Sequence, residues 1–544
     1  MVRRGSFGRL GVQIHTGILY SVTLDQVSQL DHDATIALTT IREWRNSLVR
    51  INRLPLDVLS LIPTYLPSQE DHLRASFVCR HWRRTFLQCA KLWSTLFLSK
   101  GEAYVKTLLE RVKGSPLVVQ VGRSDTRNDI PISTMALLSS HTSRIRDLKF
   151  ALRGWTGIQR FMDINPGPFP LLDSLSFRST EDIRLGPNDI TMPPSMRFFG
   201  TAVNLRELLF HSSSDWSPPL SHFVFPNLVV FDFMTLELDF HASQFLDFLE
   251  ASPMLRTVRT RVNPYTSFNS IPPERVVVLP NVEILDIIVA EGAPCYEIMA
   301  HISCPTITST SLTFEEDYDA MVVEDIFPTH AVWNTIVQQY ARSPLEEVAL
   351  ELNNDTSCTL TLQSSDATVV RLRVLVEAYN ETGDELQREV FTEVTTAVLK
   401  HPQLANVKRF RICHDYGCVV PTFTPHVANE VGRLFRSLGP LDELTIYHSD
   451  IRPYFNSILS IIEDHMGKSV ILSPIRDLIV SHPKGLSVEE CTTAIVGLAQ
   501  ARHAVGVPFE RVIIRALSMP AGVKEGLRLW VGNVEYCHAE RHDY

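Results

Sequence analysis

A short apolar pattern recurs along most of this chain and constrains its fold more than any other feature. Each copy reads apolar, two variable residues, apolar, one variable residue, apolar, and proline often stands one or two positions ahead of it. The copies begin at Ile145, Leu172, Leu205, Leu228, Leu255, Val282, Ile307, Leu345, Val407, Leu441, Ile475 and Phe509. The last four copies start 34 residues apart, and a fixed spacing in this range is typical of repeat architectures.

The pattern predicts one short strand in each copy. The second and third apolar residues are two positions apart, so they point to the same face of a strand. Proline disfavours helix in the residue before it, so it ends the preceding segment. Helix-like stretches such as 243–252 and 430–439 lie between copies. A single unit cannot bury its apolar face, whereas a stack of units can; the alternative is independent strands in an ordinary α/β domain.

The repeated pattern resembles a leucine-rich-repeat solenoid in which Leu, Val, Ile and Phe interchange. It lacks the Asn or Cys that regular repeats carry after the third apolar position. The resemblance implies an irregular leucine-rich-repeat-like solenoid over residues 99–535, within a chain of the α/β class. The gap between the copies at Leu345 and Val407 is too long for one unit, and 358–379 alternates like a hairpin. Either one repeat is degenerate there or a strand pair is inserted.

The residues ahead of the repeats have a different, helical periodicity. In residues 24–50 the apolar side chains are separated mainly by three, four or five positions, which predicts an amphipathic lead-in helix. These side chains are Leu24, Val27, Leu30, Ile36, Ile41, Trp44 and Leu48. We expect a disordered tail at residues 1–23 and a C-terminal tail at residues 536–544.

Three short helices are predicted between residues 54 and 86. The first has apolar residues at helical spacing from Leu54 to Leu66, and Pro55 suits its first turn. Ser68 and Asp71 have capping-box spacing for the second helix. The third places Trp82 on its apolar side, with Arg80, Arg83 and Arg84 on the opposite side. Helices of this size bury little area, so an exposed apolar face on them indicates a partner.

The same stretch resembles the F-box family. The matching segments are Leu54-Pro55-x-Asp57-Val58-Leu59, Ile62, Tyr65-Leu66, Asp71-x-Leu73, Ser76-Phe77-Val78-Cys79-Arg80-x-Trp82-Arg83 and Leu92-Trp93. The resemblance implies a three-helix F-box at residues 51–98 that binds a Skp-type adaptor and, through it, a cullin-RING ubiquitin ligase. The adaptor-binding residues that it implies are Leu54, Pro55, Val58, Leu59, Ile62, Leu66, Leu73, Val78 and Trp82.

Two details qualify the carry-over of residues from the family. Each of these side chains could instead belong to the core of the F-box, and we favour a core position for Trp82 and Phe77. Pro63 stands where the family commonly has an aromatic or aliphatic residue, and a proline inside a helix costs about 3 kcal/mol. We therefore expect the first helix to end or kink at residues 61–62, or the motif to have drifted and to bind its adaptor more weakly.

The composition excludes several classes of protein. A net charge of −10 argues against nucleic acid as the main partner, and no apolar run is long enough to span a membrane. The nine cysteines show no regular pairing, which fits a reducing compartment, either cytoplasm or nucleus.

No set of residues predicts catalysis, a cofactor or a metal. Cys413-His414 with Cys418, and Cys537-His538 with His542, lack the paired C-x-x-C units of a specific zinc site. The acidic run from Glu315 to Asp319 is typical of a solvated loop. The sequence thus predicts no catalytic residue and no metal or cofactor site.

These observations lead to two hypotheses. The first is a non-catalytic substrate-recognition subunit of a Skp/cullin/F-box ubiquitin ligase, which binds the adaptor through the F-box and an unknown target protein through the repeat domain. The alternative is a leucine-rich-repeat scaffold that mediates protein interactions without driving ubiquitination, and Pro63 is the residue that favours it.

Overall fold

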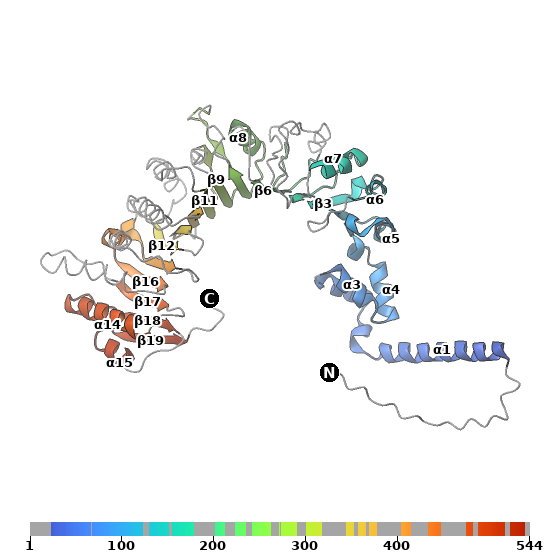
Figure 1. The fold of residues 1–544 in the computed structure, drawn as a ribbon, viewed down its shortest axis with the longest axis horizontal. Coiled ribbons are helices and arrows are strands. Elements are labelled where there is room, and N and C mark those ends of the chain that lie inside the picture. Colours follow the sequence, from blue (N-terminus) through green and yellow to red (C-terminus); the bar gives the residue numbers. More distant parts are fainter. Residues whose placement is uncertain are drawn as a thin grey trace, which may run out of the picture. The chain divides into compact units, whose positions relative to one another are not determined.

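A computed structural model of the chain shows two compact units (Figure 1). The first comprises Met1–Leu96 with Ala103–Leu117, and the second Phe97–Glu102 with Val118–Tyr544. The structure describes residues 23–66, 68–122, 130–151, 155–178, 202–212, 224–235, 242–262, 271–272, 274–290, 301–317, 344–352, 357–365, 369–377, 404–414, 433–447, 475–481, 488–516 and 523–538.

Helices dominate the first unit and strands the second. The α-helices with both ends in the described residues include α1 (Leu24–Ser47), α2 (Leu56–Leu61), α3 (Gln69–Ser76), α4 (Arg80–Gln88), α5 (Glu102–Val112), α6 (Ile132–Ala136), α7 (Trp155–Ile164), α8 (Ala242–Glu250), α14 (Val488–Ala504) and α15 (Val523–Arg528). The 3-10 helices are η2 (Arg50–Arg53), η3 (Ile62–Tyr65), η4 (Ala90–Trp93), η5 (Leu98–Lys100), η6 (Thr142–Arg144) and η10 (Leu404–Asn406).

A strand begins at or near each copy of the apolar pattern. The strands are β1 (Thr95–Phe97), β2 (Leu117–Gly122), β3 (Ile145–Ala151), β4 (Ser174–Arg178), β5 (Glu207–Ser212), β6 (Val230–Thr235), β7 (Thr257–Val262), β8 (Val277–Val278), β9 (Ile284–Ala290), β10 (Ile302–Ser303), β11 (Ser309–Asp317), β12 (Leu345–Leu352), β13 (Ser357–Ser364), β14 (Val369–Glu377), β15 (Arg409–His414), β16 (Leu441–Tyr447), β17 (Ile475–Ser481), β18 (Arg511–Ala516) and β19 (Asn533–His538).

The strands of the second unit pair mostly in chain order and in parallel. From β3 the order is β4, β5, β6, β7, β9 and β11, and from β15 it is β16, β17, β18 and β19. The short strands β8 and β10 pair separately, also in parallel. Parallel neighbours need a crossover connection between them, and α8, between β6 and β7, is one such connection.

The long gap between two copies of the pattern contains an inserted strand pair. Strand β12 pairs in parallel with β15. After β12 the chain turns back into β13, which is antiparallel to both β12 and β14. Strand β14 pairs in parallel with β11, so the order in the sheet is β11, β14, β13, β12, β15. Strand β13 therefore runs antiparallel to both of its neighbours, and the hairpin alternation of residues 358–379 reflects an insertion.

The backbone register aligns the repeated apolar positions across the sheet, and the insertion keeps this alignment. The residues that pair across neighbouring strands at the second position of the pattern are, in their order across the sheet, Leu148, Leu175, Leu208, Phe231, Val258, Leu285, Thr310, Val370, Leu362, Val348, Phe410, Leu444, Leu478, Val512 and Val534. A slip of one residue would move a strand's apolar side chains to the opposite face, so burial of this face fixes the register.

Aromatic side chains form the interior of the first half of the sheet. The third apolar position places Phe150, Phe177, Phe210 and Phe233 on adjacent strands, with neighbouring ring centroids 4.9 to 5.3 Å apart. All four are buried. Helix α7 packs on this face through Phe161, whose ring meets Phe150 edge-on at 5.3 Å.

Helix α8 covers the next strands in the same way. Phe248 and Phe245 of α8 have ring centroids 4.7 and 6.3 Å from that of Phe231 on β6. Both α7 and α8 lie on the face of the sheet that carries the aligned apolar side chains (Figure 1). Large buried aromatic rings contribute strongly to stability, and edge-on or offset pairs add about 0.5–1.5 kcal/mol each.

Side-chain amides connect successive turns ahead of the strands. Asn204 donates to the carbonyl of Pro170 at 2.7 Å, Asn227 to that of Val203 at 2.7 Å, and Asn281 to that of Pro253 at 3.0 Å. Each Asn directly precedes the first apolar residue of its copy. Regular leucine-rich repeats carry their Asn after the third apolar position, so an Asn ahead of the first apolar residue was not predicted from the sequence.

Two expectations from the sequence need correction. Strand β19 continues to His538, so the tail predicted from residue 536 overlaps its last three residues. The acidic run that includes Glu315, Glu316 and Asp317 belongs to strand β11 and is not a loop; Asp319 lies outside the described residues. None of the described helices combines the length and the apolar composition that crossing a membrane requires.

Candidate protein-docking site

Prolines flank helix α2 on both sides, with Pro55 at its N-cap and Pro63 two residues after its last residue. Pro55 precedes its first residue, and its carbonyl accepts a hydrogen bond from the backbone N–H of Leu59 at 2.9 Å. The α-helix ends at Leu61, and residues Ile62–Tyr65 continue as the 3-10 helix η3. Because proline has no N–H to donate within a helix, a change of helix type next to Pro63 follows from the sequence. The predicted end of the first helix at residues 61–62 is thus confirmed.

Helix α3 begins at the predicted cap. The Ser68 hydroxyl oxygen accepts from the backbone N–H of Asp71 at 3.2 Å and donates to the Asp71 carboxylate at 2.6 Å. This hydrogen bond from Ser68, assisted by the charge of Arg74, lowers the pKa of Asp71 below its usual value. Asp71 therefore remains ionised at the positive end of the helix, where a negative charge is favourable.

Helix α4 supplies the centre of a small core. Trp82 and Phe86, one turn apart, are buried and meet edge-on with centroids 5.4 Å apart. The Trp82 indole N–H donates to the Asn52 side-chain oxygen at 2.6 Å, and the Asn52 amide donates to the Asn46 carbonyl at 2.8 Å. This chain of bonds connects α4 to η2 and to the end of α1. The core position favoured for Trp82 is confirmed.

Trp93 anchors the end of the domain. It is 1% exposed, and its indole N–H donates to the Phe86 carbonyl at 2.8 Å. The Arg111 guanidinium of α5 lies 4.9 Å from the centre of the Trp93 ring, within cation–π distance. Leu59, Leu92 and Phe86 are buried as well.

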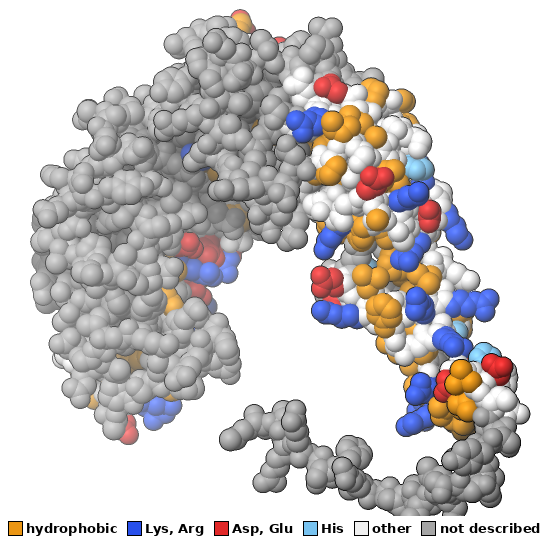
Figure 2. Space-filling view, turned by 45° about the vertical axis from the view of Figure 1, so that its right-hand side comes forward, with side chains coloured by type: hydrophobic (Ala, Val, Ile, Leu, Met, Phe, Trp, Pro, Cys, Tyr) orange, Lys and Arg blue, Asp and Glu red, His pale blue; other side chains and the backbone are white. Residues whose placement is uncertain are grey.

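Around this core many large apolar side chains are exposed. We call seven of them the docking surface: Leu56, Val58, Leu61, Tyr65, Leu73, Phe77 and Val78, which are 37% to 85% exposed. They belong to α2, η3, α3 and the two residues after α3. Both α2 and α3 contact α4, and α3 also contacts η3. Figure 2 shows hydrophobic side chains at the surface of this unit among many Lys and Arg side chains.

The structure divides the residues predicted to bind the adaptor into three groups. Pro55, Val58, Leu73 and Val78 are exposed, and Leu54, Ile62 and Leu66 are half-buried. Leu59 and Trp82 are buried and so belong to the core. The core position favoured for Phe77 is wrong, because its ring is 70% exposed and lies beneath the Arg83 guanidinium, 5.8 Å from the ring centre.

Four docking-surface residues are absent from the adaptor-binding residues predicted from the sequence: Leu56, Leu61, Tyr65 and Phe77. Leu61 lies two positions after the buried Leu59 and so falls outside the helical stripe that contains it, whereas Leu56 is the exposed first residue of α2. An apolar residue off the buried stripe of a short helix was the signal that could have identified Leu61.

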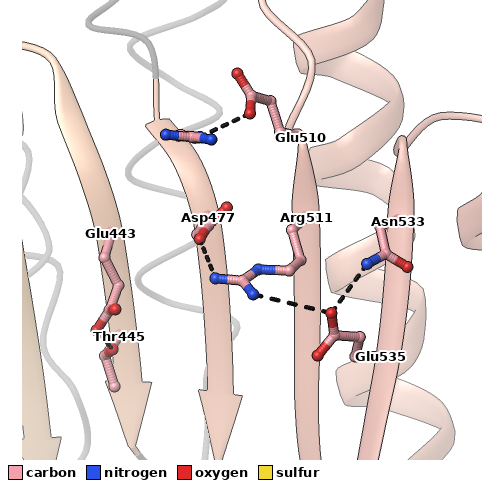
Figure 3. A network of polar contacts seen from close by, with 8 residues as sticks. Glu443, Thr445, Asp477, Glu510, Arg511, Asn533 and Glu535 are labelled. Carbon is pink, nitrogen blue, oxygen red and sulfur yellow. Dashed lines mark hydrogen bonds and ion pairs between the residues drawn. The ribbon is translucent and has the colours of Figure 1, made fainter.

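The strand face of the second unit carries a different surface, built from charges. Arg511 on β18 forms ion pairs with Asp477 on β17 and, at 3.9 Å, with Glu535 on β19, whose carboxylate also accepts from Asn533 at 2.9 Å (Figure 3). The bond to Asp477 raises the pKa of Arg511 above its ordinary value.

Similar pairs join other neighbouring strands. Glu347 on β12 is 7% exposed and lies 3.2 Å from Arg409 and 3.1 Å from Arg411, both on β15. Asp232 on β6 lies 3.1 Å from His211 on β5 and 3.7 Å from Arg259 on β7. Because each of these acidic groups is compensated by a neighbouring strand, the face is polar yet locally balanced.

The cysteine and histidine clusters give no metal centre in the described part of the chain. Burial, and next the nearby Glu351 carboxylate, raise the pKa of the Cys413 thiol to about 11, so this thiol is protonated near neutrality. Cys418 and His542 lie outside the described residues.

Comparison with known proteins identifies one domain. Residues 51–99 match the F-box-like family, and these residues contain α2, α3, α4 and the docking surface. No curated protein matches the chain. The chain therefore contains an F-box-like domain at residues 51–99, a type of domain that serves protein–protein interaction, and residues 51–96 of it belong to the first unit.

Proposed function

We propose that this protein is a non-catalytic substrate-recognition subunit of a Skp/cullin/F-box ubiquitin ligase. The docking surface binds a Skp-type adaptor, which connects the chain to a cullin-RING ligase. The second unit, a leucine-rich-repeat-like solenoid, holds a target protein. Holding the target near the transferred ubiquitin raises its effective concentration, so the chain needs no catalytic group of its own.

The exposure of the docking surface is the observation that carries this proposal. Tyr65, Phe77 and Val78 are 85%, 70% and 63% exposed. A soluble domain seldom exposes so many large apolar side chains on a few short helices unless a partner covers them. Aromatic residues at the centre of an interface often provide most of its binding energy, so Tyr65 and Phe77 are the expected anchors.

Exposed arginines surround the apolar side chains and define the chemistry of the partner. Arg53, Arg83 and Arg84 are exposed next to α2 and along α4. Arg80 is already paired with Glu43 at 2.7 Å. A partner that fits this surface has an apolar groove with an acidic rim, because opposite charges at the rim accelerate encounter and orient the two proteins.

The strand face of the second unit is the proposed target surface. Successive parallel strands present their side chains at regular intervals, and a target can contact many of them at once. Ion pairs such as Arg411 with Glu347 and Arg511 with Asp477 keep the face ordered before the target binds. Preordering reduces the entropy lost on binding.

A binding measurement with a matched control tests the adaptor contact. Purified Skp-type adaptor is titrated calorimetrically into the full chain carrying Leu61→Asp or Leu171→Asp, two substitutions of leucines that are 56% and 48% exposed in different units. We expect Leu61→Asp to weaken binding at least about tenfold, or about 1.4 kcal/mol, and Leu171→Asp to leave it unchanged. No binding by the unsubstituted chain, or equal binding by Leu61→Asp, overturns the adaptor contact.

A second measurement separates the ligase subunit from a scaffold. The chain is assembled with the adaptor, a cullin-RING ligase and a ubiquitin-conjugating enzyme, and ubiquitin transfer to proteins held by the second unit is followed. The proposal predicts transfer that Leu61→Asp abolishes. Tight adaptor binding without transfer would favour the alternative, a leucine-rich-repeat scaffold that does not drive ubiquitination.

A further inference from the structure

Helix α1 exposes a regular apolar seam. Seven residues of the helix and its C-cap are separated alternately by three and four positions: Val27, Leu30, Ala34, Ala37, Ile41, Trp44 and Leu48. We call them the α1 seam. No residue of α1 is buried, and Leu30, Ile41 and Trp44 are 65%, 59% and 65% exposed. Alternation of three and four is the heptad spacing by which two helices pack into a coiled coil.

The charges of α1 indicate what covers the seam. Its first half carries Asp25, Asp31 and Asp33, and its second half carries Arg42 and Arg45. The one acid of the second half, Glu43, is paired with Arg80 of α4 at 2.7 Å. An antiparallel copy of the helix would place acidic half against basic half at both ends, whereas a parallel copy would place acid against acid.

The sizes of the seam residues fit the same arrangement. When Ala34 faces Ala37 of the second copy, Val27 faces Trp44 and Leu30 faces Ile41. Large side chains then meet at both ends, and small ones meet in the middle, where they let the helices approach closely. We propose that α1 pairs with α1 of a second copy of this chain as an antiparallel two-helix coiled coil.

The F-box-like domain is bonded to the C-terminal end of α1. Besides the Glu43–Arg80 pair, the Asn52 amide donates to the Asn46 carbonyl at 2.8 Å, and the Arg53 guanidinium to the Ser47 carbonyl at 3.3 Å. Thr23 and Gln26 form a capping box at the other end. A helix of 24 residues is about 36 Å long, and its seam covers three heptads. Because so short a coiled coil binds weakly, we expect the amount of dimer to depend on protein concentration.

Sedimentation equilibrium of the full chain, between about 1 and 100 µM, tests the pairing. We expect a monomer that becomes a dimer as concentration rises, and a monomer throughout for Leu30→Asp combined with Ile41→Asp. The Leu61→Asp variant, altered only in the docking surface, should dimerise like the unsubstituted chain. A monomeric unsubstituted chain, or a dimer that survives the double substitution, overturns the proposal. Loss of dimer by Leu61→Asp would assign it to the docking surface instead.

Exchanging the charges of α1 tests whether attraction between its acidic and basic halves stabilises the dimer. Asp31→Arg with Asp33→Arg gives a helix that is basic in both halves, and Arg42→Asp with Arg45→Asp gives one that is acidic in both. Each variant alone should dimerise at least about tenfold more weakly, and an equimolar mixture should recover the dimer. Unchanged dimerisation of either variant alone would contradict a role for these charges.

Cysteine cross-linking fixes the direction of the pair. Chains carrying Val27→Cys are mixed with chains carrying Trp44→Cys, oxidised, digested and analysed by mass spectrometry. The antiparallel arrangement predicts a disulfide between positions 27 and 44. A disulfide between two copies of position 27 in the Val27→Cys chain alone would show a parallel pair and overturn the proposal.

Discussion

The F-box-like domain and the sheet of the second unit use apolar residues in opposite ways. In the sheet, each described copy of the pattern buries its repeated side chains, and Leu148, Phe231 and Leu478 have no exposed surface. In the F-box-like domain, Leu59 and Phe86 are buried, while Leu61 and Phe77 are mostly exposed. Apolar side chains thus stabilise the sheet from within, whereas many of those in the smaller domain are available for a partner.

The same contrast holds for charges. The sheet places carboxylates such as Glu347 and Asp232 at buried positions between basic side chains from neighbouring strands. The helical unit keeps its ion pairs at the surface, as with Arg80 and Glu43, whose side chains are 73% and 51% exposed. Equivalent substitutions in the two regions should therefore have different consequences for stability and binding.

Truncation of phenylalanine should give the largest difference. Phe231→Ala removes a ring that is fully buried against Phe233 and Phe248, and we expect a loss of about 3–5 kcal/mol in the free energy of unfolding. Phe77→Ala removes an exposed ring, so stability should change by no more than about 0.5 kcal/mol while adaptor binding weakens. Denaturant titration and adaptor calorimetry measure the two effects; a large loss of stability in Phe77→Ala would contradict the contrast.

The strand pattern was predictable because burial on one face leaves a regular trace in the sequence. The inserted strands could not be distinguished from a degenerate repeat in advance. Leu360 and Leu362 of β13 alternate as they would in either case, and their pairing with Leu350 and Val348 depends on strand direction. Alternation reports which face a residue occupies, but it does not report which neighbour the strand pairs with.

The docking surface was harder to predict, because short helices leave little periodicity. Phe77 was assigned to the core by spacing, yet it is the C-cap of α3, where the chain leaves the helix and the spacing no longer determines direction. Trp82 lies inside α4 and was assigned correctly. Spacing was thus reliable within a helix and failed at its end.

Removal of an acid should give the next largest difference. Glu347→Ala leaves Arg409 and Arg411 on the strand face without their shared, nearly buried carboxylate, and we expect a loss of about 1–3 kcal/mol in the free energy of unfolding. Glu43→Ala removes an exposed partner and should cost no more than about 0.5 kcal/mol. Thermal and denaturant unfolding in low and high salt measure the free energy of unfolding lost in each of the two variants. Equal losses for both variants would show that burial does not distinguish the two pairs.

Two buried threonines should differ in the sign of their effect. Thr260 on β7 is fully buried, and its hydroxyl has no hydrogen-bond partner in the described structure, so Thr260→Val should stabilise the chain by about 1 kcal/mol. Thr85 on α4 is also buried, but its hydroxyl donates to the His81 carbonyl at 3.0 Å. Thr85→Val should therefore destabilise by about 0.5–1.5 kcal/mol. Denaturant titration of both variants decides, and the same sign for the two would refute the distinction.

Thiol reactivity should show the smallest effect on the fold, since it probes the sheet without altering it. The pKa of Cys413 is raised from 9.0 to about 11, mainly by burial, so below pH 9 its thiolate fraction is about a hundredfold lower than that of an ordinary thiol. Cys537 on β19 is exposed. We expect iodoacetamide to modify Cys537 first, and the rate at Cys413 to increase about tenfold per pH unit up to pH 10. Peptide mass spectrometry measures both rates. Modification of Cys413 at pH 7 as fast as that of Cys537 would show that the pairing of β15 with β12 and β16 opens more readily than the burial of this part of the sheet allows.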